Sequence, residues 1–233
     1  KINCEFLYSG DIFSDDILKV VARNRGLPEN WCTRRFNYGD IPFALNFNNI
    51  TEARDLLIRH IRNGSKIQIV VDCDVDGYCS AAIVYKLCWE IAAVEGTHFN
   101  IDGKGLIGTT FSIHSGKQHG LSADIKIDKD TNLVIVPDAG SNDVLKCLEL
   151  SQQGIDVLIL DHHIMDVKNP YATIVNCMDG IYPNEICGTA VSWQFARAVN
   201  YKYGKSIDIY EWLDRVAVAT VADSMNVTIE ENM

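Results

Sequence analysis

The chain has 233 residues, of which 47% are hydrophobic and 22% charged. These proportions predict a soluble globular protein with a sizeable core, and no apolar run approaches the roughly 20 residues that span a bilayer. The net charge of −10 argues against a general nucleic-acid binder with a basic face, although bound dications would offset part of that charge. Eight cysteines without a C-x-x-C pair favour reduced thiols in a cytoplasmic protein over a structural zinc site.

The first half of the chain predicts an irregular segment followed by regular elements. Residues 1–48 suggest one short helix over 15–22 and loops at 27–30 and 38–42, and we expect them to form an N-terminal extension packed on the core. Residues 49–233 are expected to be the main domain. Apolar residues at helical spacing predict a helix from Thr51 to Asn63-Gly64, a buried strand over 67–71, and a helix after Gly77.

The second half alternates apolar strands with helices. Strands are predicted over 110–113, 133–136, 157–160 and 173–175, and helices over 142–153, around 191–199 and over 210–221. Continuous apolar strands that alternate with helices indicate an α/β protein, in which a parallel β-sheet is flanked by helices on both faces. Ligands bind at the carboxyl ends of the strands in such sheets.

Three aspartates, Asp72, Asp74 and Asp76, follow the strand over 67–71. Carboxylates this close repel one another, so a cluster at a strand end is costly unless a cation lies among the oxygens. The run D-x-D-x-D-G also resembles the start of an EF-hand calcium loop. That reading is disfavoured because a strand precedes the run and Ile83 stands where the loop needs glutamate.

Further acidic and histidine side chains follow other predicted elements: Asp138, Asp161-His162-His163 and Asp223. Each alone could be a cap or a surface residue, but together they indicate one metal site. Carboxylate and imidazole ligands without thiolates suit Mn²⁺ or Mg²⁺. At least five of these residues are candidate ligands, Asp74, Asp76, Asp138, His162 and Asp223. Five exceed what one ion needs from the protein, and two ions about 3.5–4 Å apart would explain the excess. The predicted chemistry is metal-assisted hydrolysis of phosphoesters or phosphoanhydrides.

With these residues the chain resembles the DHH phosphoesterase superfamily, and within it the RecJ-type branch of single-strand-specific exonucleases. The family's name describes Asp161-His162-His163. The resemblance extends over about residues 48–233 and includes four motifs in order, found here at 70–77, 136–142, 161–163 and 217–225. It implies a Rossmann-like, three-layer DHH catalytic domain.

The resemblance also implies residue roles. Asp74, Asp76, Asp138, His162 and Asp223 would bind two ions, with Mn²⁺ expected and Mg²⁺ as the alternative. Asp72 and Asp161 would be ligands or would orient ligands, and His162 and His163 would act in catalysis. His163 would contact the scissile phosphate or its leaving oxygen; its alternative is a purely structural role. Further phosphate contacts are expected from the loosely matching stretch with His114, Lys117 and His119, and from Asn142 in the second motif.

The implied function is 5′–3′ exonuclease activity on single-stranded DNA. A first alternative keeps the metal site but acts on oligonucleotides, cyclic dinucleotides or pyrophosphate. Those branches begin the first motif with a histidine, where this chain has Ile69-Val70-Val71. A second alternative is a degenerate replication scaffold. RecJ-like proteins continue into a DHHA1 domain that grips nucleic acid. This sequence ends just after the fourth motif, so such a domain is an expected partner.

Overall fold

The computed structural model describes residues 17–24, 26, 28, 30, 41–97, 108–116, 118–121, 125–179, 181–182 and 185–226. The chain divides into two units, residues 1–41 with Met233 and residues 42–232. The described part of the first unit contains α1 (Ile17–Asn24), which extends two residues beyond the predicted helix end. The assignment of residues 1–48 as an extension packed on the core stays a prediction.

The second unit is built on one parallel sheet, as the sequence predicts. Its strands are β1 (Ile67–Val71), β2 (Thr109–Ile113), β3 (Leu133–Pro137), β4 (Asp156–Asp161) and β5 (Thr173–Asn176). They lie in the order β2-β1-β3-β4-β5, and every neighbouring pair is parallel. The chain leaves β1 toward β2 on one side and β3 toward β4 on the other. The carboxyl ends of β1 and β3 therefore flank a topological switch point, where ligands bind in sheets of this kind.

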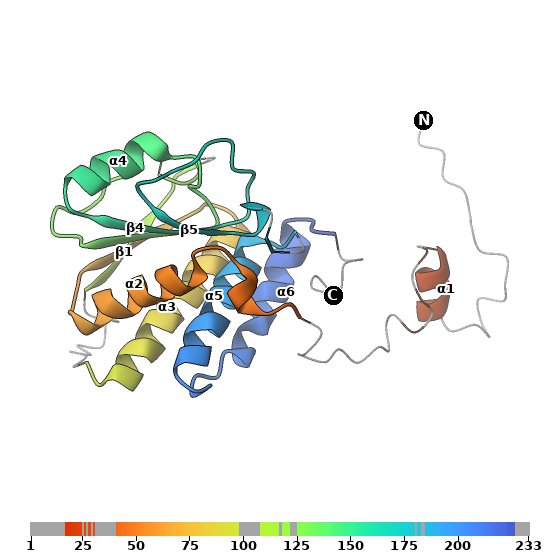
Figure 1. Cartoon of the computed structure of the whole chain (residues 1–233). Helices are drawn as coiled ribbons and strands as arrows, with labels where there is room; N and C mark the ends of the chain where they lie inside the picture. The colour runs from red at the N-terminus through yellow and green to blue at the C-terminus, as the bar shows by residue number, and fades with distance from the viewer. Residues whose placement is uncertain are drawn as a thin grey trace. The chain divides into compact units, whose positions relative to one another are not determined.

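Helices cover both faces of the sheet (Figure 1). One face carries α2 (Ile50–Arg62), α3 (Val75–Glu95), α5 (Gly188–Lys202) and α6 (Leu213–Ala222), and the other carries α4 (Val144–Gln152). Short 3-10 turns span Ala44–Asn46, Cys177–Asp179 and Tyr210–Trp212. Among the described residues, no helix is both long and apolar enough to cross a membrane.

The core forms on both sides of the central strands. Every residue of β1 and β3 is buried, as expected for strands covered by helices on two faces. On the α4 side, valines and isoleucines of β3 and β4 pack with Cys147 and Leu150 in one cluster. Because side chains alternate along a strand, the intervening residues face the layer that contains α3 and α5.

Three helix starts differ from the prediction, the first of them for a local reason. The helix after β1 begins at Val75 rather than after Gly77, because Asp74 caps it: the Asp74 side chain accepts a hydrogen bond from the Gly77 N–H. The next helix begins at Val144 instead of 142. The predicted helix over 210–221 is a 3-10 turn followed by α6.

Candidate metal centre

The three aspartates after β1 lie in three different local settings. Asp72 follows the strand and is 2% exposed, Asp74 caps α3, and Asp76 lies in the first turn of α3 and is 2% exposed. All three follow β1 as predicted, but only Asp72 precedes the first residues of the helix region, because α3 begins at Val75 with Asp74 as its cap. A β-carbon on Gly77 would lie 2.5 Å from that of Asp72, so this tight turn requires glycine.

Asp76 is held by the amino terminus of α5. Its Oδ2 accepts a hydrogen bond from the Gly188 N–H and its Oδ1 one from the Thr189 N–H, both at 2.7 Å. The Thr189 hydroxyl also donates to the Asp76 carbonyl at 3.0 Å. Unpaired N–H groups at a helix start stabilise an anion, so this carboxylate is fixed in place at the switch point.

Asp138 follows β3 in a strained conformation, with φ at 75°. Its N–H donates to the Leu160 carbonyl at 2.7 Å, which ties it to β4. Its Oδ1 is buried and has no hydrogen-bond partner among the described residues. Burial and the adjacent carboxyl of Asp76 raise the pKa of Asp138 to about 11. A buried carboxyl oxygen that accepts no hydrogen bond fits a cation ligand.

The space around Asp138 depends on a glycine. A β-carbon on Gly188 would lie 2.8 Å from the Asp138 α-carbon and would overlap its Oδ1. Glycine at this position therefore lets α5 begin directly against the aspartate. Neither Gly188 nor Thr189 was among the site residues predicted from the sequence.

His162 joins the carboxylates into one centre. Its Nε2 lies 3.3 Å from Asp138 Oδ1, 3.8 Å from Asp76 Oδ2 and 3.8 Å from Asp223 Oδ2. Asp223 follows the end of α6, and its side chain is 31% exposed. The partial burial of its carboxyl, together with the nearby carboxylates of Asp76 and Asp74, raises its pKa. Two sets of side chains could each hold a metal ion, and both include His162: Asp138, His162 and His163; Asp76, His162 and Asp223.

Asp161, at the end of β4, differs from Asp138 in its hydrogen bonds. It is 1% exposed, and its carboxylate accepts bonds from the backbone N–H groups of Ser141, His162 and His163. Its Oδ1 also lies 2.8 Å from His163 Nδ1. Burial would raise the pKa of Asp161, but bonds from His163 and Ser141 outweigh it and lower that pKa to about 2. The same bond raises the pKa of His163. Asp161 therefore orients His163 and the loop after β3.

The predicted phosphate contacts lie in different settings. His114 is 6% exposed, and its Nε2 donates to the Gly120 carbonyl at 2.6 Å, while its Nδ1 has no partner among the described residues. The His119 ring is exposed, and its Nδ1 lies 2.7 Å from Asp72 Oδ2. The sequence did not reveal this Asp72–His119 pair, because it joins segments 47 residues apart.

The side-chain amide of Asn142 forms hydrogen bonds to the backbone through both its nitrogen and its oxygen. Its Nδ2 donates to the Ile164 carbonyl, and its Oδ1 accepts from the Asp166 N–H, both at 2.9 Å. A phosphate contact by Asn142 would replace one of these bonds and stays a prediction. Lys117 lies outside the described residues.

A pocket of about 290 Å³ adjoins His119 and His163, two histidines that each contact a buried aspartate. It is lined by His119, Gly120, residues 139–143, Asp161 and His163. Asn176, at the end of β5, supports one wall: its Nδ2 donates to the Ser141 hydroxyl at 3.0 Å and to the His163 carbonyl at 2.9 Å. Asn176 was not among the predicted site residues, although a polar residue directly after the predicted strand over 173–175 was a signal that could have identified it.

Comparison with known proteins gives a consistent set of relatives. The DHH family, N-terminal domain, matches residues 66–220. The putative SPbeta prophage-derived single-strand DNA-specific exonuclease YorK of Bacillus subtilis (strain 168) is 30% identical over 214 residues, which are 91% of this chain and 35% of that protein. The single-stranded-DNA-specific exonuclease RecJ of Haemophilus influenzae is 29% identical over 190 residues, 75% of this chain and 31% of that protein.

Among solved structures, RecJ in complex with Mn²⁺ from Thermus thermophilus matches with a TM-score of 0.59 and 20% identity. The match covers 78% of this chain and 25% of that one, and it shows that the two share a fold. The chain spans about a third of the length of the two curated relatives.

Proposed function

The chain belongs to the DHH family, and on that premise we propose that it hydrolyses phosphodiester bonds of single-stranded DNA by a two-metal mechanism. The observation that carries the proposal is the convergence of three carboxylates on His162 Nε2 at 3.3–3.8 Å, those of Asp76, Asp138 and Asp223. Two adjacent cations account for more carboxylates than one ion needs. The relatives are described as single-strand DNA-specific exonucleases, which supports the choice of substrate.

The residues present fit divalent cations that prefer oxygen and imidazole ligands, with Mn²⁺ the expected ion and Mg²⁺ the alternative. The proposed ligands are Asp74, Asp76, Asp138, His162 and Asp223. Asp74 lies outside both ligand sets, but its negative charge contributes to the raised pKa of Asp138. Asp72 pairs with His119 instead, so its proposed role is to orient that ring.

Bound cations would supply Lewis acidity for the attack of water on a phosphate. The chain's own residues would position the substrate and move the proton. Asp161 holds His163 through Nδ1, which leaves Nε2 available beside the pocket. Because this contact raises the pKa of His163, the ring retains its proton to higher pH and can donate it toward the leaving oxygen.

The test is degradation of end-labelled single-stranded DNA with Mn²⁺ or Mg²⁺. Asp138→Ala and His162→Ala should each abolish product formation, whereas Asp166→Ala, at an exposed position, should not. Labels at either end would show whether nucleotides leave from the 5′ end, which the RecJ-like form of the motifs favours. Absence of hydrolysis of any single-stranded DNA with either metal would overturn the proposal.

The same assay separates the alternative substrates. Faster turnover of dinucleotides, cyclic dinucleotides or pyrophosphate than of long single-stranded DNA would favour a small-molecule phosphoesterase. We also propose that a DHHA1-type domain, which the resemblance to RecJ-like proteins implies, supplies further binding surface, since this chain matches only about a third of each curated relative.

A further inference from the structure

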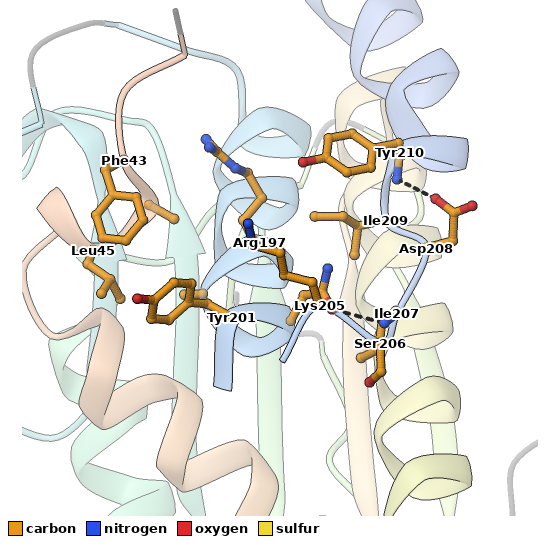
Figure 2. Close-up of a pocket in the computed structure, with 13 residues that line it drawn as sticks. Phe43, Leu45, Arg197, Tyr201, Lys205, Ser206, Ile207, Asp208, Ile209 and Tyr210 are labelled. Carbon is orange, nitrogen blue, oxygen red and sulfur yellow. Dashed lines mark hydrogen bonds between the residues drawn. The ribbon is translucent and has the colours of Figure 1, made fainter. Parts of the chain in front are cut away.

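A second hollow lies toward the end of α5 that is remote from the metal centre. Its volume is about 390 Å³, and it is formed by residues 43–45, the last two turns of α5 and the segment 205–210. Figure 2 shows Phe43 and Tyr201 on one side, Tyr210 on the other and Arg197 between them. A volume of this size is typical of small-molecule sites.

Three aromatic side chains of this hollow are exposed to solvent: Phe43 is 46% exposed, Tyr201 54% and Tyr210 43%. The rings of Phe43 and Tyr201 pack edge to face, with centroids 5.7 Å apart. Tyr210 packs on Trp193 in the same manner at 6.3 Å. Each ring thus packs against another aromatic ring and still exposes apolar surface to water, which is a typical sign of a binding surface.

Two cations border the same rings. The Arg197 guanidinium donates to the Pro42 carbonyl and to Gln194 Oε1 and lies 5.2 Å from the Trp193 ring centroid. Lys205 has no ion-pair partner among the described residues. Its φ of 65° is unusual for a residue with a side chain, and its N–H bonds to the Asn200 carbonyl at 2.8 Å. The end of α5 therefore presents a lysine side chain on a fixed backbone.

The lining of the hollow also includes the carboxylate of Asp208, which has a structural role in the adjacent turn. Asp208 Oδ1 accepts a hydrogen bond from the Tyr210 N–H at 3.2 Å, which starts the 3-10 turn that carries Tyr210. Exposed aromatic rings next to cations are the combination that binds unpaired nucleotides: bases stack on the rings and phosphates contact the cations.

We propose that this hollow is a second nucleic-acid contact, which stacks an unpaired base of a single strand on Tyr201 or Tyr210 and binds a phosphate through Lys205. The proposal rests on the proposed function, because the strand would be the substrate. Asp76 is bound at the start of α5, and Tyr201 lies 13 residues after Gly188. That separation is roughly 20 Å along a helix, or about six nucleotides at stacked spacing.

The test measures binding separately from cleavage. Fluorescein-labelled (dT)15 and (dT)3 are titrated with the full chain in EDTA and followed by anisotropy, and (dT)3 hydrolysis is measured with Mn²⁺. Tyr201→Ala and Lys205→Glu should each weaken (dT)15 binding by about 5- to 100-fold and leave (dT)3 hydrolysis unchanged. Tyr201→Phe should retain affinity, because it keeps the ring.

Matched controls are Tyr171→Ala, which removes another exposed ring, and Lys129→Glu, which makes the same charge change elsewhere. Equal effects of the controls, unchanged (dT)15 affinity, or saturation of the hollow by free dTMP would overturn the proposal. If the wild type binds (dT)15 more tightly than (dT)3 but hydrolyses neither with Mn²⁺, the proposed function alone is overturned. The two failures can therefore be told apart.

Discussion

Replacing Asp138 by asparagine should stabilise the metal-free protein at neutral pH. The carboxyl is 2% exposed, and burial together with Asp76 raises its pKa from 3.8 to about 11. At pH 7 the metal-free native state therefore keeps a proton that the unfolded state has lost. Because the native state binds more protons, the free energy of unfolding falls as pH rises between the two pKa values.

The magnitude follows from the distance between pH 7 and the ordinary pKa. About three pH units at about 1.4 kcal/mol each give a cost of about 4 kcal/mol for Asp138. Ionising the buried carboxyl instead would cost more, so protonation is the cheaper route. Asparagine has the same shape, stays neutral in both states and can donate to Asp76. Asp138→Asn should thus gain up to about 4 kcal/mol at pH 7 and little near pH 4.

The assay is urea unfolding followed by tryptophan fluorescence in metal-free buffers from pH 4 to 8. The difference between Asp138→Asn and wild type should grow by about 1.4 kcal/mol per pH unit, and Asp166→Asn, at an exposed position, supplies the baseline. Adding Mn²⁺ at 100 times its Kd should stabilise the wild type by about 2.7 kcal/mol per site and the variant by less. Parallel pH curves in metal-free buffer would show that Asp138 is ionised there and would refute this reasoning.

Three further changes test the centre. Gly188→Ala places a methyl group against Asp138 and should lower the free energy of unfolding by about 1–3 kcal/mol and weaken Mn²⁺ binding in calorimetry; unchanged affinity would contradict the packing argument. Asp161→Asn should lower the pKa of His163 in an NMR titration. The stabilisation from this pair is complete below the unfolded pKa of His163 and is lost as pH rises through its folded pKa, so the variant should lack that dependence. His162→Ala removes the shared ligand and should reduce the Mn²⁺ stoichiometry from two, and retention of two tight sites would argue against a shared imidazole.

The strands and the edge of the sheet that carries the site could be predicted from the sequence. Residues 67–71, 133–137 and 156–161 are almost continuously apolar, and such runs alternating with helices indicate a parallel sheet covered on both faces. Parallel strands share one carboxyl edge, so residues that follow different strands, such as Asp138 and Asp161, had to lie near one another. This inference needed no knowledge of side-chain conformation.

The contacts across the site could not be predicted, because they depend on how separate elements approach one another. Nothing in the spacing of Asp72 and His119 indicates that they pair at 2.7 Å. The role of Gly188 likewise depends on the placement of α5 against the loop after β3. The start of α3 was misplaced for a local reason: Asp74 was interpreted only as a ligand, whereas its side chain also caps the helix.

The contrast between two buried aspartates shows which carboxylates call for a cation. Asp161 and Asp138 are equally buried and lie at the ends of neighbouring strands. Asp161 accepts bonds from Ser141, His162 and His163, which lower its pKa to about 2, so the fold alone stabilises its negative charge. Asp138 has a buried oxygen that accepts no hydrogen bond, although His162 Nε2 lies 3.3 Å from it, and a pKa raised to about 11. Burial is common to both, and the supply of hydrogen-bond donors is what differs. The missing donors at Asp138 therefore mark the position where a bound cation would stabilise the charge, whereas Asp161 is suited to hold His163 in place.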